Sequence, residues 1–460
     1  MSNSQQLTAP APALWLRDWL LISSMACLAL AIGLYNPMLA LAGLGIVFAG
    51  VMIGDRVELV LLPLLVLMPL DLKIDIGSQP AYLDLVPGIL AIPLLRKLLA
   101  ERHKVNLWPL ALAGFAAMAV LTTISRSDKA SWVLESGLRL VVVLVFATAI
   151  ASYGEVEKII LAAGWSLLPA VGYAVYQMLA GGLGPAFDLF SGQSGATDVA
   201  SHWAGRPFST FGHPNLFGFY CAIVCAMLFA VIVCSESRLR RKMALGLSLL
   251  GMMGVLSSGS RGAWMGLAAV IAILTLTGYL RARYLLIGAA LVVLMLYVLS
   301  SLNPVGSGHV SEFGDETVGT RMQLWRAAFI MFLSQPLTGV GWMNYTPRLT
   351  SFIDWRDLPA DHAHSTYLSC LAETGVIGFI LFFAPIAIVF RRSALSHRSN
   401  IAALAGFLGL TVFLVHGIVD EMFYSPQAIL AFGVALGLAS RASFQATLWR
   451  SSAIVGSRGA

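Results

Sequence analysis

Long apolar runs separated by short polar stretches recur along the whole chain of 460 residues. Most runs approach the ~20 residues that an α-helix needs to cross the hydrocarbon core of a bilayer. The pattern therefore predicts about fourteen transmembrane helices, of which the third is short and could instead dip into the membrane and return. The predicted spans cover 17–35, 37–53, 57–72, 82–99, 107–124, 132–152, 156–181, 211–234, 242–258, 262–279, 284–301, 364–390, 400–417 and 424–440.

The polar stretches divide the chain into five parts. A cytoplasmic tail over 1–16 precedes transmembrane helices 1–11, which occupy 17–301. A long outside loop over 302–363 follows, then helices 12–14 over 364–440 and a second cytoplasmic tail over 441–460. The arrangement predicts an all-α integral membrane protein with one sizeable segment outside the membrane.

The long outside loop is predicted to contain an amphipathic helix over 321–334, with Thr320 as its N-cap and Pro336 just beyond its end. Apolar residues fall on one face of this helix at helical spacing, which is typical of a helix lying on a membrane surface. They are Met322, Trp325, Phe329 and Phe332.

Composition and charge agree with this organisation. Hydrophobic residues make up 58% of the chain and charged residues only 11%, with a mean hydropathy of +0.81. With the N-terminus in the cytoplasm, inside segments hold about twice as many Lys and Arg residues as outside segments. That bias accounts for the net charge of +6 without a nucleic-acid partner.

The twelfth predicted span opens with the first polar group of interest, His362 and His364. On a regular helix, Gly375 would lie about 20° from the face of His364. With Gly378 it would line a groove that another helix or a lipid chain could enter. Alternatively, His364 only hydrogen-bonds a neighbour. The two histidines could also bind a metal, but the sequence shows no further cluster to complete such a site.

Arginines at the predicted outer ends of the helices form the second group. Arg261 follows Ser260 in a small-residue turn, where backbone N–H groups and a guanidinium suit a phosphate. It could instead extend to lipid headgroups. Arg321 lies in the first turn of the loop helix, where the helix dipole disfavours a cation, and this hints at a function. Arg326 is expected to face solvent or headgroups.

Further polar residues precede the eighth span and follow the thirteenth. Arg206, His213 and Asn215 could hold sugar hydroxyls or phosphate, or their stretch could only shape the entry to a helix. Asp420 and Glu421, in the last outside loop, give a weak signal for orienting a base or an acceptor. Inside the membrane, Glu135 and Arg139 are spaced i,i+4 and are expected to form a structural pair.

These residues resemble the O-antigen ligase and O-antigen polymerase superfamily of bacterial envelope glycosyltransferases. Four ordered patterns between about 205 and 380 carry the resemblance. They are Arg206…Phe211-Gly212…Pro214-Asn215; Ser260-Arg261-Gly262; Arg321…Trp325…Pro336…Gly339…Gly341; and His364-Ser365, nine residues, then Gly375-x-x-Gly378. The long outside loop before the last few helices agrees with the same superfamily, but the patterns do not single out one member.

The resemblance implies a GT-C-like membrane fold and a glycan donor linked to a polyprenyl (undecaprenyl) diphosphate, with no metal, cofactor or nucleotide sugar. By matching motif, His364 would be the general base and Arg261 and Arg321 would hold the diphosphate. Histidine suits this role because its side chain titrates near neutral pH. The remaining candidates for binding donor or acceptor are Arg206, His213, Asn215, His362 and Arg326.

The predicted activity is an inverting glycosyl transfer on the periplasmic side of the bacterial inner membrane, with both termini in the cytoplasm. A ligase would pass the glycan to lipid A–core, and a polymerase to a growing lipid-linked chain. The predicted number of helices slightly favours a polymerase. The alternative is a multispan transporter or flippase for lipid-linked sugars. Transporters place polar groups near mid-membrane in repeated halves, whereas here those groups lie at the outer boundary.

Overall fold

The computed structural model describes residues 58–70, 73–76, 79–82, 107–124, 130–180, 206–281, 283, 315–353, 362–423 and 425–456. The spans predicted over 17–35, 37–53 and 284–301 lie outside the described residues, as do nearly all of 82–99 and the side chain of Glu135.

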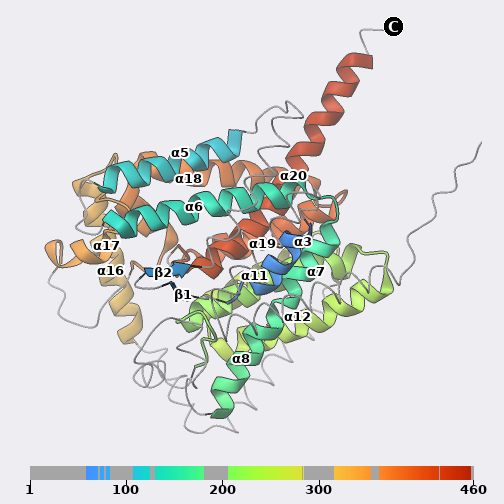
Figure 1. Ribbon diagram of the computed structural model, residues 1–460, viewed down its shortest axis with the longest axis horizontal. Coiled ribbons are helices and arrows are strands. Elements are labelled where there is room, and N and C mark those ends of the chain that lie inside the picture. The colour runs from blue at the N-terminus through green and yellow to red at the C-terminus, as the bar shows by residue number, and fades with distance from the viewer. Residues whose placement is uncertain are drawn as a thin grey trace, which may run out of the picture.

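Helices dominate the described chain (Figure 1). They are α3 (Glu58–Leu67), α5 (Leu107–Ile124), α6 (Ala130–Ser152), α7 (Val156–Trp165), α8 (Leu167–Ala180), α11 (Pro214–Cys234), α12 (Arg238–Ser258), α13 (Arg261–Leu276), α16 (Asp315–Ser334), α17 (Tyr345–Arg348), the 3₁₀ turn η3 (Leu349–Ser351), α18 (Thr366–Ser396), α19 (Ile401–His416) and α20 (Pro426–Gly456). A short antiparallel hairpin of β1 (Lys73–Ile76) and β2 (Gln79–Tyr82) joins them.

The prediction of an all-α membrane protein is confirmed, apart from this hairpin, which the apolar pattern did not indicate. Within the described ranges, three helical stretches are long and apolar enough to cross a bilayer: Val156–Leu179, Pro214–Cys234 and Thr366–Ser396. Shorter apolar helices accompany them.

Several predicted boundaries were wrong. The loop helix begins at Asp315, so Thr320 lies inside α16 and is not its N-cap. The final helix continues through the predicted tail to Gly456. The short third span ends at Leu67, after which the chain turns into β1. Helix ends depend on caps and tertiary contacts more than on hydropathy, so apolar runs locate them poorly.

The centre of the molecule is formed by α11, α19 and the first part of α20, through Ser440, whose side chains are almost all buried. Glycines let these helices approach one another closely, as is common in membrane proteins. A Cβ atom on Gly406 of α19 would lie 2.2 Å from the backbone nitrogen of Ala439 in α20. One on Gly437 would lie 2.5 Å from the carbonyl oxygen of Ala147 in α6.

Helix α18 is broken at Gly375, where φ is 63° and ψ is −168°. The segment 336–341, which follows α16, lies against the break and satisfies the freed backbone groups. Val340 N–H and Gly341 N–H donate to the carbonyls of Ala372 and Glu373, both at 2.9 Å. In the other direction, Val376 N–H donates to the Pro336 carbonyl, also at 2.9 Å.

This break corrects the prediction that His364 and Gly375 share one face of a regular helix. The space beside Gly375 is taken by the chain's own loop, because a Cβ there would lie 2.4 Å from the backbone carbon of Leu337. Gly339 in the loop lies equally close to α18, since a Cβ atom on it would lie 2.2 Å from the backbone carbon of Glu373. The two glycines therefore interlock α18 with the end of the long loop.

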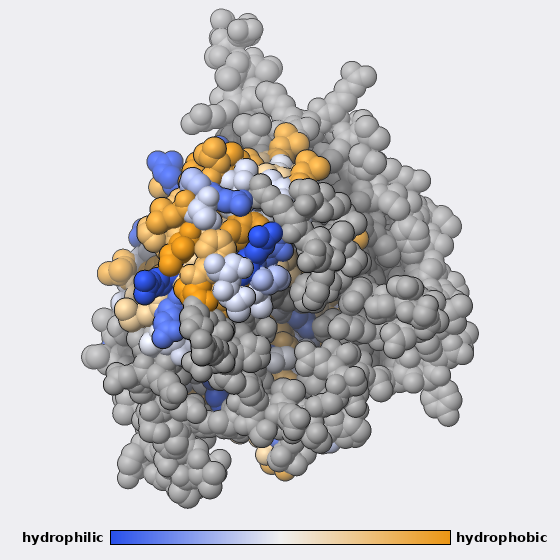
Figure 2. Space-filling model, turned by 90° about the vertical axis from the view of Figure 1, so that its left-hand side faces the viewer, coloured by the Kyte–Doolittle hydropathy of each residue, from blue (hydrophilic) through white to orange (hydrophobic). Residues whose placement is uncertain are grey.

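Helix α16 lies across the direction of the long helices at one end of the molecule (Figure 1). Its inner face packs into a small core through Leu324, Ala327, Ala328 and Met331. On its outer face Met322 and Phe329 are exposed, while Trp325 and Phe332 are half-buried. Figure 2 views this end, where the described surface mixes apolar and hydrophilic side chains. This arrangement suits the predicted position on a membrane surface.

Candidate active site

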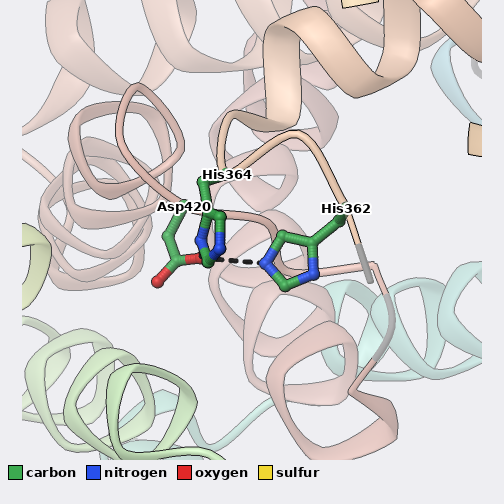
Figure 3. Close-up of side chains that lie close together, drawn as sticks. All are labelled: His362, His364 and Asp420. Atoms are coloured by element: carbon green, nitrogen blue, oxygen red, sulfur yellow. Dashed lines mark hydrogen bonds and ion pairs between the residues drawn. The ribbon is translucent and has the colours of Figure 1, made fainter. Parts of the chain in front are cut away.

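Two histidines and an aspartate meet at the end of the molecule where α18 begins (Figure 3). The Nε2 atom of His362 lies 3.3 Å from Oδ1 of Asp420, and Nδ1 of His364 lies 3.2 Å from the same oxygen. Asp420 is buried, whereas the histidines are partly exposed. The weak sequence signal at Asp420 thus corresponds to a direct contact with the candidate base.

The start of α18 is tied to the loop that carries Asp420. The backbone N–H of Thr366 donates to the carbonyls of Gly417 and Asp420 at 2.9 and 3.0 Å, and its hydroxyl also donates to the Asp420 carbonyl. Ser365 caps the helix by accepting from the N–H of Leu368. His364 precedes this cap with a positive φ of 50°, a conformation that is uncommon outside glycine.

The hydrogen bonds define the protonation of the cluster. Burial alone would raise the pKa of Asp420, but the bonds from His362 and His364 hold that pKa well below its usual value. Asp420 is therefore a carboxylate, which can only accept hydrogen bonds. It follows that Nδ1 of His364 carries a proton, so in the neutral ring Nε2 is left with a free lone pair.

Next to this cluster lies a small polar pocket. Its lining includes Arg206, Asn215, Gly259, Arg261, Gly262, Arg321, Val419 and Asp420. Among these lining residues three guanidiniums face one carboxylate. The balance of charge makes the pocket suitable for an anion, and guanidiniums bind phosphate oxygens in bidentate geometry.

Arg206 is held in the pocket wall by two hydrogen bonds. Its Nε donates to the Ser258 carbonyl and its Nη2 donates to Oδ1 of Asn215, both at 2.8 Å. His213 caps α11 by accepting the N–H of Asn215 on Nδ1 at 3.0 Å. Burial lowers the pKa of His213 to about 3, so it is neutral and its remaining proton is on Nε2.

Arg261 is the first residue of α13 and is exposed toward the pocket at the helix N-terminus. Ser260 is the N-cap, accepting the N–H of Ala263 at 3.3 Å, and Gly259 supplies the left-handed turn before it with φ of 61°. A helix N-terminus is itself favourable for an anion. The adjacent residues Gly259, Ser260 and Arg261 therefore account for this side of the pocket.

Arg321 reaches the pocket from α16, far along the chain. It is partly buried, and burial lowers the pKa of its guanidinium. Arg326 is exposed and is not part of the pocket lining. The seven other candidate residues from the sequence either line this pocket, cap one of its helices, or contact Asp420 beside it.

The sequence showed no residue that could complete a metal site with His362 and His364. The structure places Asp420 beside them. The ligand atoms of His362, His364 and Asp420 lie within 4.8 Å of one another, close enough to share one ion. The neighbouring arginines oppose this, since their positive charges raise the free energy of a cation and lower that of an anion. Charge therefore favours an anion at this end of the molecule.

Three buried residues around the site were not singled out by sequence, or only weakly. His416 contacts Ser260, with Nε2 and Oγ 3.3 Å apart. Glu373 accepts the N–H of Tyr345 at 2.9 Å and so connects α18 to the loop after α16. Glu421 accepts the N–H groups of Met422 and Phe423 through Oε1, each at 3.0 Å. For Glu421, the sequence signal was an acidic residue in the last outside loop.

Comparison with known proteins identifies one segment. Residues 245–383 match the family model described as O-antigen ligase, and this supports the superfamily resemblance. The match contains Arg261, Arg321, His362 and His364, but it covers less than a third of the chain. Arg206 and Asp420 lie outside it. No curated protein matches the chain.

Proposed function

We propose a specific reaction for this membrane protein, supported by the match of residues 245–383 to the O-antigen ligase family model. It transfers a glycan from a polyprenyl diphosphate donor to a hydroxyl group of an acceptor sugar. The acceptor is lipid A–core or a growing lipid-linked chain, and the reaction takes place on the periplasmic side of the inner membrane. His364 is the general base.

One observation carries this proposal: Asp420 belongs both to the anion pocket and to the cluster that holds His364. An anion held by the arginines would thus lie next to a histidine whose Nε2 lone pair is free. A displacement reaction with an anionic leaving group needs these two groups side by side. A transport site has no need for an oriented base.

The proposed reaction uses His364 as the base and the diphosphate as the leaving group. Nε2 of His364 takes the proton of the acceptor hydroxyl while the hydroxyl oxygen attacks the anomeric carbon of the donor. The bond from that carbon to the diphosphate oxygen breaks, and its electron pair leaves with the polyprenyl diphosphate. Attack from the side opposite the leaving group inverts the anomeric centre.

The protein stabilises both charges that develop. Asp420 stabilises the imidazolium of His364 through the bond to Nδ1, which also fixes the ring orientation. Arg261 and Arg321, supported by Arg206, stabilise the diphosphate. These guanidiniums supply the positive charge that a divalent cation supplies in other phosphate sites.

The test is the length profile of lipid-linked glycans in cells that carry only the His364→Ala protein. We expect product formation to fall by about 10² to 10⁴, the usual contribution of a general base. Single repeats accumulating on the carrier would identify a polymerase, and long chains retained on the carrier would identify a ligase. His397→Ala, which alters a histidine bonded to Tyr279 far from this cluster, is the control and should give the wild-type profile.

Two outcomes contradict the proposal. A wild-type profile from a correctly inserted His364→Ala protein would remove the histidine from the reaction. Lipid-linked repeats trapped on the cytoplasmic leaflet would identify a flippase instead.

A further inference from the structure

Helix α19 ends beside both parts of the candidate site, the cluster of His362, His364 and Asp420 and the anion pocket. His416 is its last residue, and Asp420 follows four positions later with its N–H donating to the His416 carbonyl at 3.1 Å. Asp420 reaches the base, His364, as described above. His416 reaches the opposite wall, where α13 begins.

The contact of His416 is with the cap of α13. The imidazole is fully buried, and its Nε2 atom lies 3.3 Å from Oγ of Ser260. The same Oγ accepts the N–H of Ala263, so it serves the helix N-terminus and the histidine together. Arg261 follows this cap directly and lines the anion pocket.

Packing reinforces the hydrogen bond. A Cβ atom on Gly262 would lie 2.9 Å from Cδ2 and 3.0 Å from Nε2 of His416. Only glycine at this position lets α13 approach the imidazole so closely. On another side Phe219 of α11 meets the ring edge-on, with centroids 5.1 Å apart. The ring therefore fills a defined space between α11, α13 and α19.

We propose that His416 is a positioning residue that sets the location of Arg261 relative to the base. It does not touch the substrate; it fixes the cap of α13, while Asp420 on the same short stretch fixes His364. One helix end thereby sets the separation between the diphosphate and the attacking hydroxyl. This inference rests on the proposed function, and it gives the Ser260-Arg261-Gly262 motif a reason for each of its three residues.

The first test is binding of farnesyl diphosphate, a soluble short-chain polyprenyl diphosphate, to the purified full-length protein in detergent, measured by calorimetry. His416→Ala should weaken binding by about fivefold to tenfold, the usual effect of losing one buried hydrogen bond. His416→Gln, whose amide can reach Ser260, should restore most of the affinity. Wild-type affinity in a folded His416→Ala protein would overturn the inference.

Asp420→Asn is the matched variant at the other end of the same stretch. It removes a negative charge from an anion pocket, so farnesyl diphosphate binding should stay equal or strengthen while glycan transfer falls. General damage to the fold would weaken binding in both His416→Ala and Asp420→Asn, so it would not produce opposite changes in affinity. If Asp420→Asn weakens binding as much as His416→Ala does, the division of roles is wrong.

A second test uses Gly262. Gly262→Ala should weaken binding because its methyl group pushes against the imidazole. Combining it with His416→Ala removes that clash and leaves only the 3.0 Å contact with Cγ2 of Val419, so the double variant should bind about as well as His416→Ala alone. Effects that simply multiply would mean that the two residues act separately and would overturn the inference. If His416→Ala does not fold, Gly262→Ala still decides the question, because wild-type affinity in that variant would overturn the inference.

The binding measurement also separates this inference from the proposed function. Full activity of His364→Ala would refute the proposed base without changing the role of His416 in diphosphate binding. Normal farnesyl diphosphate affinity in a folded His416→Ala protein, together with an inactive His364→Ala protein, would refute only the positioning role.

Discussion

The two ends of the helix bundle carry charge in contrasting ways. At the end away from the candidate site, Arg240 pairs with Glu157 at 2.7 Å and Lys158 pairs with Glu155 at 2.8 Å, and these side chains are partly exposed. Arg441 donates to the carbonyls of Tyr153 and Gly154, where α6 ends. At the site end, Asp420 is buried, and the residues around it include three arginines and two histidines.

Burial is what separates the two arrangements. Exposed ion pairs contribute only ~0–1 kcal/mol each to stability. At a membrane boundary, such charged residues need only lie outside the hydrocarbon core. A buried carboxylate beside several cations costs several kcal/mol in desolvation, which its hydrogen bonds must offset. Such a cluster is weak evidence for stability. Buried groups with strongly shifted pKa values are, however, concentrated at functional sites. This difference supports the proposal that the chemistry takes place at the end that holds Asp420.

Replacing Gly375 should have the largest effect. Gly375→Ala places a side chain at φ of 63° and ψ of −168°, within 2.4 Å of the Leu337 backbone. We expect at least ~3 kcal/mol of destabilisation and no glycan transfer, because the loop holding Arg321 can no longer pack on α18. Gly246→Ala is the control: its Cβ would meet nothing within 4 Å, and it should fold normally. Thermal unfolding in detergent measures both, and an equally stable Gly375→Ala protein would refute the interlock.

Removing one carboxylate from each end tests the comparison directly. Asp420→Asn should lower glycan transfer on the order of 100-fold, because the amide lacks the negative charge that stabilises the His364 imidazolium. Glu157→Gln breaks the pair with Arg240 at the opposite end and should leave transfer within about twofold. Product formation in membranes with equal protein amounts is the measurement. Equal effects of the two variants would remove the distinction between the ends.

Exchanging arginine for lysine gives a smaller effect. Arg321→Lys keeps the charge but loses bidentate geometry, so transfer should fall by roughly tenfold, the equivalent of ~1.4 kcal/mol. Arg240→Lys at the other end should have no effect on transfer. If Arg321→Lys is as active as wild type, Arg321 contributes only its charge.

The smallest effect concerns stability against pH. Burial raises the pKa of Glu421 from 4.5 to about 8, so the folded protein holds a proton that the unfolded chain releases above pH 4.5. This group therefore stabilises the fold fully below pH 4.5, and the contribution is lost as pH rises toward 8. Glu421→Gln should flatten the decline in unfolding temperature between pH 5 and pH 8, as checked by thermal melts in detergent. An unchanged slope would show that Glu421 is ionised in the folded protein.

Much of the local architecture could be predicted from sequence. The apolar run over 107–124 matches α5 (Leu107–Ile124), and the start of α13 with its Ser260 cap and Arg261 follows from adjacent residues. The break at Gly375 could not be predicted in this way. It depends on backbone hydrogen bonds from segment 336–341, and hydropathy at Gly375 continues as in an ordinary helix.

The sequence by itself determined the class of the protein, most of the long helices in the described part of the chain and the residues capable of chemistry, because hydropathy and functional groups are local properties. Only the tertiary structure decided that Asp420 holds His364 and that His416 holds the cap of α13. These pairs are 56 and 156 residues apart along the chain. Contacts over such separations depend on how α13, α18 and α19 pack against their neighbours, and no spacing pattern along the chain records that packing.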